Sequence, residues 1–156
     1  MKENSYKALV RPVLEYASPV WDPYTASNIQ KLETIQRRAA RWVSHRFRQT
    51  SSVEDMLLEL KWPTLETRRK HSRLTMFYKY HNKLVHIQSK YAPTKSTNLH
   101  CARQDNSQAY DIPQYKQEYR QADFFPRTIP QWNHLPEHVV AAETLDIFKS
   151  RLAALL

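Results

Sequence analysis

The sequence predicts a mainly α-helical fold of about four to five helices, with a loosely ordered polar arm, a short β-hairpin as an option within it, and a C-terminal helix. Three observations support this prediction: apolar residues recur at helical spacing, a Ser with Glu or Gln three positions later precedes two of these segments, and the composition changes after residue 85. We therefore expect a helical domain in residues 1–85, a polar connector in 86–123 and a C-terminal aromatic block and helix in 124–156.

The first predicted helix runs from about Ser5 to Ala17. Pro12 lies inside it and should kink the helix or restart it, because proline has no N–H and crowds the preceding turn. Two Xaa-Pro pairs then bracket Trp21, which predicts an extended turn. The apolar residues of this helix follow one face: Tyr6, Leu9, Val10, Val13, Leu14 and Ala17.

The second predicted helix opens at Ser27, which forms a capping box with Gln30, and runs to about His45 or Phe47. One side is expected to be buried, and Trp42 on that side is interpreted as a core residue and not as a stacking platform. The apolar side comprises Ile29, Leu32, Ile35, Ala39, Trp42 and Val43, and the opposite side comprises Arg37, Arg38, Arg41 and Arg48.

Two further helices follow. Ser51 with Glu54 predicts a short helix that ends near Trp62 and contains Val53, Met56, Leu57 and Leu60. A third capping residue, Thr64, predicts the longest helix, from about Leu65 to Leu84. In it the basic residues Arg68, Arg69, Lys70 and Arg73 precede the aromatic residues Phe77, Tyr78 and Tyr80.

Residues 86–123 are rich in Gln, Ser, Asn, Tyr and Pro and lack periodicity, which indicates a connector or weakly ordered arm. Spaced tyrosines between Gln108 and Phe125 are the only basis for the hairpin option. The aromatic and proline-punctuated block FFPRTIPQWNHLP follows, and Phe124, Phe125 and Trp132 in it should pin the C-terminal module. Thr144 then caps a last helix with the apolar stripe Leu145, Phe148, Leu152 and Leu155.

The positive charge of the chain is concentrated in two segments. The net charge is +9, and residues 27–50 and 61–83 contribute +5 and +6 of it, offset mainly by −3 in residues 51–60. A concentrated basic surface is typical of proteins that bind a polyanion, because each neutralised phosphate releases counterions. For any single basic run, a solvated helix surface is the alternative.

Several classes of function are disfavoured. The chain has no glycine, which phosphate-binding loops, dinucleotide fingerprints and nucleophile elbows require. The acidic cluster of Glu54, Asp55 and Glu59 suits a helix N-terminus better than a two-metal site. The scattered histidines and the lone Cys101, beside His100, give no zinc half-site and no supported thiol catalysis. We therefore expect no catalytic residue, no metal ligand and no cofactor.

The lengths of the apolar runs also bear on location. No run reaches the roughly 18 apolar residues of a membrane span, and the first residues lack the apolar core of a signal peptide. We expect an intracellular chain without membrane contact.

The strongest candidates for function are the basic helix faces. Arginine contacts phosphates well because its planar fork can donate to two oxygens, and such contacts do not read base sequence. Nothing in the chain suggests a motif that reads bases. The candidate nucleic-acid-binding residues are Arg37, Arg38, Arg41, Arg68, Arg69, Lys70 and Arg73.

The order of several segments resembles a known family. LVRPVLEYASPVWDP followed by KLETIQRRAARWV is similar to the segment after the polymerase palm in reverse transcriptases of non-long-terminal-repeat retrotransposons, the jockey-like LINE elements. SSVEDMLLELKWPTLETRRKHSRLTMFYKYHNKL resembles the next helices of that family, and FFPRTIPQWNHLP with LDIFKSRL resembles its closing block. Residues 86–123 match least well.

This resemblance implies a thumb and a C-terminal extension, without the catalytic Tyr-Ala-Asp-Asp strand of the palm and without the endonuclease. The chain would then be a non-catalytic fragment of an RNA-directed DNA polymerase whose thumb-like helices hold template-primer nucleic acid, as RNA–DNA hybrid or duplex DNA, without sequence specificity. A palm fused upstream would be a further partner, and the nucleus would be the expected location.

One main alternative stays open at this point, beside a residual nuclease that only metal-dependent cleavage by the purified protein would support. The chain would be a structural or protein-interaction helical module, or an inert retroelement remnant, that binds no nucleic acid. An isolated thumb would expose the apolar surface that otherwise contacts a palm, with Tyr6, Leu9 and Val13 as candidates.

Overall fold

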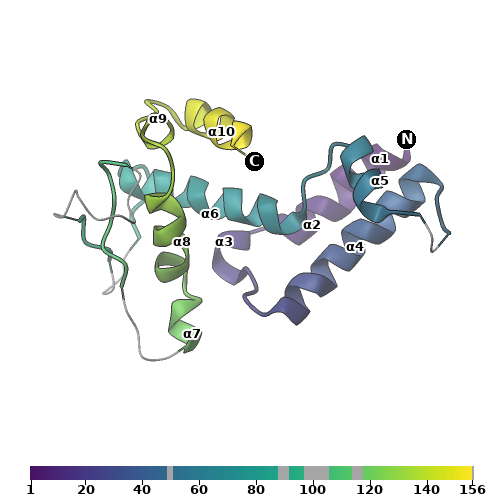
Figure 1. The fold of residues 1–156 in the computed structure, drawn as a ribbon, viewed down its shortest axis with the longest axis horizontal. Helices are drawn as coiled ribbons and strands as arrows, with labels where there is room; N and C mark the ends of the chain where they lie inside the picture. The colour runs from purple at the N-terminus through teal and green to yellow at the C-terminus, as the bar shows by residue number, and fades with distance from the viewer. Residues whose placement is uncertain (49–50, 88–91, 97–105, 114–117, 156) are drawn as a thin grey trace. The chain divides into compact units, whose positions relative to one another are not determined.

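The computed structural model describes residues 1–48, 51–87, 92–96, 106–113 and 118–155, and its helices confirm the predicted mainly α fold (Figure 1). The chain forms two compact units, Met1–Lys70 and His71–Leu156. The division between these units falls inside the longest predicted helix. The two units are described separately below.

The first helical stretch begins earlier than predicted and is interrupted where Pro12 requires it. α1 (Lys2–Ser5) continues into a π-helical turn, η1 (Tyr6–Val10), and then into α2 (Arg11–Glu15), in which Pro12 occupies the first turn. A wider turn before a proline relieves the crowding between its ring and the carbonyl four residues earlier. The predicted restart at Pro12 is thus confirmed.

The segment after this helix differs from the prediction. Ala17 adopts a left-handed conformation with φ 49°, and the short helix α3 (Ser18–Trp21) follows, where the sequence suggested an extended turn. Pro19 is compatible with this helix because it lies in the first turn, where backbone N–H groups have no helical acceptor. The Trp21 indole N–H donates to the Tyr16 carbonyl and closes the turn at 2.5 Å.

α4 (Ala26–Ser44) and α5 (Val53–Glu59) complete the first unit up to residue 60. α4 is capped by Thr25 without a side-chain hydrogen bond, so the predicted capping box at Ser27 is wrong. The helix ends at Ser44 and is capped by His45, which is left-handed with φ 55°, so the earlier of the two predicted ends is confirmed. The cap of α5 lies one residue later than predicted, because the Ser52 hydroxyl accepts from the Asp55 N–H at 3.2 Å.

The core of the first unit is small and partly aromatic. Its buried apolar residues are Tyr6, Ala40, Met56 and Trp62. The rings of Tyr6 and Trp62 stack with their centroids 4.6 Å apart. The Tyr6 hydroxyl donates to Gln36 Oε1 at 3.1 Å, so α4 contributes a polar group to this core.

The buried Tyr6 hydroxyl predicts a loss of stability at alkaline pH. Burial, with a smaller contribution from the charge of Glu15, raises the pKa of Tyr6 to about 12 from its ordinary value of 10.0. Between these values the unfolded chain releases the proton and the folded chain retains it, so the free energy of unfolding falls as pH rises from 10 to 12. Urea unfolding of the wild type and Tyr6→Phe across this range measures the effect.

We expect the wild type to lose roughly 2–3 kcal/mol more than Tyr6→Phe over this interval, at about 1.4 kcal/mol per pKa unit. The comparison cancels the titration of lysines, arginines and the other tyrosines, since both proteins contain them. Parallel pH profiles for the two proteins would contradict the burial of this hydroxyl.

α6 (Leu65–His81) spans the division between the units. Its start is as predicted, because the Thr64 hydroxyl accepts from the Thr67 N–H at 3.1 Å. It ends three residues before the predicted Leu84, since Lys83 is left-handed with φ 57° and the Leu84 N–H returns to the Lys79 carbonyl.

Four shorter helices complete the second unit among the described residues: α7 (Glu118–Gln121), α8 (Phe124–Asn133), α9 (Glu137–Val140) and α10 (Leu145–Ala154). The proline-punctuated block is therefore helical, with Pro130 inside α8. The Thr144 cap of α10 is confirmed, because its hydroxyl accepts from the Ile147 N–H at 3.3 Å.

An aromatic core holds the second unit together. Phe77 of α6 is fully buried, and its ring lies 4.9 Å from Trp132 and 5.2 Å from Tyr110, measured between centroids. Tyr78, on the next position of the helix, stacks on Phe148 of α10 at 4.4 Å. The expected role of the aromatic block in pinning this module is thus confirmed for Trp132, which is also fully buried.

Part of the predicted polar arm is an ordered strap across the end of α8. The Asn106 side-chain amide donates to the Trp132 and Leu135 carbonyls, each at 2.9 Å. The Asn133 side chain pairs with both the N–H and the carbonyl of Tyr110, at 3.0 and 2.8 Å. The expectation of weak order is therefore wrong for residues 106–110, because amide side chains satisfy the backbone where a helix or sheet would otherwise do so.

The hairpin that the sequence allowed between Gln108 and Phe125 is not seen in the described part of that segment. An isolated antiparallel bridge joins Lys95 to Tyr110, and the later part of the predicted hairpin contains α7. Tyr115 lies outside the described residues, and no strand occurs among those that are described.

Candidate nucleic-acid interface

α4 carries an exposed basic face made of Arg37, Arg38 and Arg41. Arg37 and Arg38 are exposed and Arg41 is half-buried. Within the described part of the chain, none of their guanidinium groups forms a hydrogen bond or ion pair. We call these three residues the α4 basic face.

Another side of α4 is buried, but it is more polar than the sequence suggested. Its buried residues are Glu33, Gln36 and Ala40. Ile35 and Trp42, which were assigned to the core, are instead 38% and 42% exposed. The predicted buried face is therefore wrong for Ile35 and Trp42, whereas Ala39 and Val43 pack against the core as expected. The buried side of the helix is shifted so that two polar side chains, Glu33 and Gln36, face inward.

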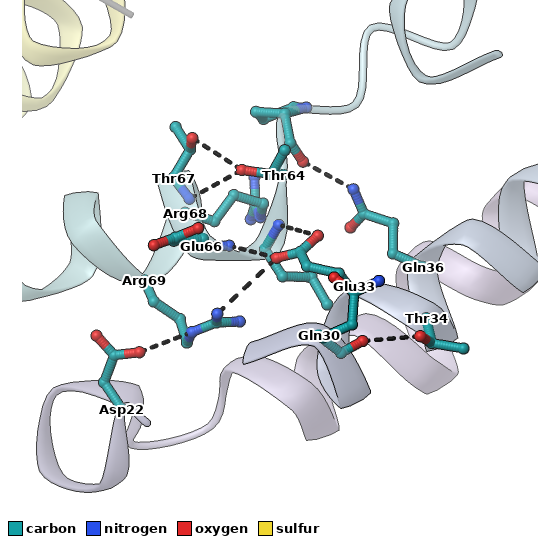
Figure 2. A network of polar contacts seen from close by, with 12 residues as sticks. Asp22, Gln30, Glu33, Thr34, Gln36, Thr64, Glu66, Thr67, Arg68 and Arg69 are labelled. Carbon is teal, nitrogen blue, oxygen red and sulfur yellow. Dashed lines mark hydrogen bonds and ion pairs between the residues drawn. The ribbon is translucent and has the colours of Figure 1, made fainter. Parts of the chain in front are cut away.

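A polar network explains this shift (Figure 2). The Glu33 carboxylate accepts from the Leu65 and Glu66 N–H groups at 3.3 and 2.8 Å, so it caps the N-terminus of α6 from a separate helix. Gln36 accepts from the Tyr6 hydroxyl and donates to the Pro63 carbonyl at 2.9 Å. These contacts hold Glu33 and Gln36 inward, and the three arginines of the α4 basic face lie beside and beyond them, on the part of the helix that stays at the surface.

Arg69 belongs to the same network and does not form the predicted basic surface. It is 1% exposed, its Nε donates to Asp22 Oδ1 at 2.8 Å, and its Nη2 lies 3.8 Å from Glu33 Oε1. Burial lowers the pKa of Arg69, while the nearby carboxylates oppose this shift. The prediction that Arg69 contacts nucleic acid is not compatible with this burial.

Arg68 and Arg73 are also engaged in the fold. Arg68 forms a bidentate ion pair with Glu15, with Nη2 2.9 Å from Oε2, and this bond raises the pKa of Arg68. Arg73, in the second unit, is 4% exposed and donates to Gln131 Oε1 at 3.1 Å. Burial and the charge of Arg127 lower the pKa of Arg73 to about 10.

The second predicted basic face is therefore mostly absent from the surface. Lys70 remains half-exposed, Arg68 already holds a carboxylate, and the other two arginines are buried. The prediction treated these charges as one face because they are close in sequence. Their partners Glu15 and Asp22 lie 53 and 47 residues away, which local patterns do not reveal.

The C-terminal end of α4 adds residues that the sequence analysis had not assigned to the interface. The Lys2 ammonium donates to the Trp42 carbonyl at 3.4 Å and lies 5.3 Å from the centroid of the Trp42 ring. Arg46 pairs with Glu59 at 2.9 Å, and Phe47 is 65% exposed. The sequence did contain one signal for this part of the surface, because Phe47 stands directly before Arg48.

Among the described residues, no three His, Cys, Asp or Glu side chains gather as metal ligands, and no helix is both long and apolar enough to cross a membrane. His81 hydrogen-bonds the Tyr110 hydroxyl at 2.9 Å, and burial lowers the pKa of His81. His100 and Cys101 lie outside the described residues.

Comparisons of the chain with protein-family models, curated proteins and solved structures find no significant match. The resemblance to reverse transcriptases of non-long-terminal-repeat retrotransposons therefore stays a prediction from the sequence.

Proposed function

We propose that this chain is a non-catalytic fragment of a retrotransposon reverse transcriptase that holds template-primer nucleic acid electrostatically, without reading its sequence. The observation that carries the proposal is the α4 basic face, whose three arginines have no partner among the described residues. Unpaired arginines on one side of a long helix are suited to phosphates spaced along a backbone.

The division of roles among the arginines narrows the proposed contact surface. Arg37, Arg38 and Arg41 would contact phosphates, whereas Arg68 and Arg69 hold α2, the turn at Asp22 and α4 around the start of α6. The proposal thus keeps one of the two predicted basic faces and reassigns the other to support of the fold. A palm fused upstream and a nuclear location belong to the same proposal.

The clamp is tested by reversing the charge of its three arginines to Glu. We expect at least a tenfold loss of affinity for a 20-base-pair DNA duplex and for an RNA–DNA hybrid, measured by fluorescence anisotropy. The dependence of log Kd on log salt concentration should also become shallower, by about 0.9 for each duplex phosphate contact that is lost.

A charge-matched control separates this surface from the net charge. Lys61, Lys83 and Lys149 are all exposed and lie outside α4, and their reversal to Glu changes the net charge by the same amount. If both triple variants lose the same affinity, the binding follows total charge and the α4 basic face has no special role. Circular dichroism verifies that each variant retains its helices.

The alternative function, a structural or protein-interaction module, is favoured by a separate observation. Leu9, Val13, Tyr16 and Val20 are between 72% and 87% exposed, which is unusual for apolar side chains of a helical stretch. Tyr6, the third residue expected on such a surface, is instead buried at 2% exposure. A folded wild-type chain that binds neither duplex nor hybrid at low salt would support this alternative and exclude the clamp.

A further inference from the structure

An exposed tryptophan adjoins the α4 basic face. Trp42 is 42% exposed, follows Arg41 directly, and stands one helical turn after Arg38. The buried cluster of the first unit contains Ala40 and is lined by Ala39 and Val43, whereas Trp42 is outside it. The indole is therefore not part of the buried core cluster, and a large part of its surface faces solvent.

Further aromatic and basic side chains follow within a few residues. Phe47 is 65% exposed, and it stands between Arg46 and the exposed Arg48. The Lys2 ammonium adds a cation 5.3 Å from the Trp42 ring centroid. Exposed aromatic rings between cations are costly for a surface that meets only water, but they suit a ligand that has both flat rings and phosphates.

A duplex offers these rings only its phosphates, because its bases are paired and stacked inside it and cannot stack on a protein side chain. Single-stranded nucleic acid presents unpaired bases, which stack on aromatic side chains regardless of sequence. We infer that Trp42, with Phe47, forms a stacking platform for unpaired bases, so that this end of α4 binds single-stranded nucleic acid next to the phosphates held by the α4 basic face. The inference rests on the proposed function and specifies its ligand.

An abasic oligonucleotide tests the platform on the unmodified protein. A dT strand and an abasic strand of equal length carry the same phosphates, but only the first carries bases. We expect the wild type to bind the dT strand at least roughly fivefold more tightly than the abasic strand in fluorescence anisotropy. Equal affinities would overturn the platform.

Trp42→Leu locates the effect. We expect this variant to lose at least roughly fivefold in affinity for the dT strand and to bind the abasic strand and the duplex as the wild type does. Trp42→Phe, which keeps a flat ring, should retain most of the affinity. The matched control is Trp21→Leu, because Trp21 is 41% exposed and lies on α3, outside the α4 basic face. Its loss should leave binding unchanged.

The outcomes separate this inference from the clamp. If reversal of Arg37, Arg38 and Arg41 weakens binding of all three ligands while Trp42→Leu weakens none, the clamp holds and the platform is wrong. If the wild type binds none of the ligands at low salt, both are wrong. If Trp21→Leu and Trp42→Leu reduce dT affinity equally, the effect is not specific to α4 and the platform is also wrong.

Discussion

Replacing Glu33 with alanine should lower the free energy of unfolding of the first unit by about 3–5 kcal/mol, the usual cost of removing one partner from a buried ion pair. The Glu33 carboxylate is the acceptor for two N–H groups at the start of α6 and the neighbour of the buried Arg69. Alanine would leave those donors without a partner and Arg69 with less countercharge in a buried site. Urea unfolding followed by circular dichroism measures the loss.

Three comparisons make this prediction specific. Glu33→Gln keeps an oxygen acceptor without the charge, so its loss should lie between those of alanine and the wild type. Glu54, an exposed acid in the first turn of α5, is the control, and its replacement by alanine should cost about 1 kcal/mol or less. The losses from Glu33→Ala and Arg69→Met should be far from additive, because the two side chains share one network. A Glu33→Ala loss no larger than that of Glu54→Ala would refute this role.

Local signals in the sequence located several helix boundaries well. Thr64 and Thr144 were identified because a capping hydroxyl bonds an N–H three residues later, and that spacing is visible in the sequence. The interruption of the first helix at Pro12 could be predicted for the same reason, since the effect of a proline is confined to the preceding turn. The Ser27 capping box was a wrong prediction, since α4 begins after Thr25 and Ser27 already lies inside the helix. A capping pattern therefore does not fix the first residue of a helix by itself.

The buried side of α4 could not be predicted from the sequence, because the groups that its side chains bond lie far along the chain. Glu33 bonds groups at residues 65 and 66, and Gln36 bonds groups at residues 6 and 63. A hydropathy pattern counts both as surface residues, and it accordingly placed Ile35 and Trp42 inside. The same limit applies to charge, since Arg69 looks like part of a basic face until Asp22 is brought next to it.

The candidate site was therefore predictable only in part. Arg37, Arg38 and Arg41 have no partner among the described residues, so their position on the helix was sufficient to place them at the surface. The strap at residues 106–110 was missed because amide side chains, and not periodic backbone bonds, hold it on α8. For the strap, the sequence could not provide the identity of partners that lie 23 to 29 residues along the chain.

Replacing Trp132 with alanine should cost about 3–5 kcal/mol in the second unit, as is usual when a large aromatic residue is removed from a core. Trp132 is fully buried, and its ring lies 4.9 Å from Phe77 and 6.0 Å from Phe148 between centroids. Its indole N–H also donates to the Gln108 carbonyl at 3.0 Å. The substitution thus opens a cavity between α6, α8 and α10 and removes a bond to the strap.

Two substitutions divide this loss between packing and hydrogen bonding. Trp132→Phe retains most of the ring but not the N–H, so the Gln108 carbonyl loses a donor, and the expected cost is about 1–3 kcal/mol. Trp21→Ala removes an indole of the same size that is 41% exposed, and it should cost much less than Trp132→Ala. Hydrogen exchange supplies the local readout, because loss of the strap should speed the exchange of the Tyr110 amide, which Asn133 protects, in both Trp132 variants. If Trp132→Phe leaves that amide as protected as in the wild type, then the side chains of Asn106 and Asn133 hold the strap without help from the indole.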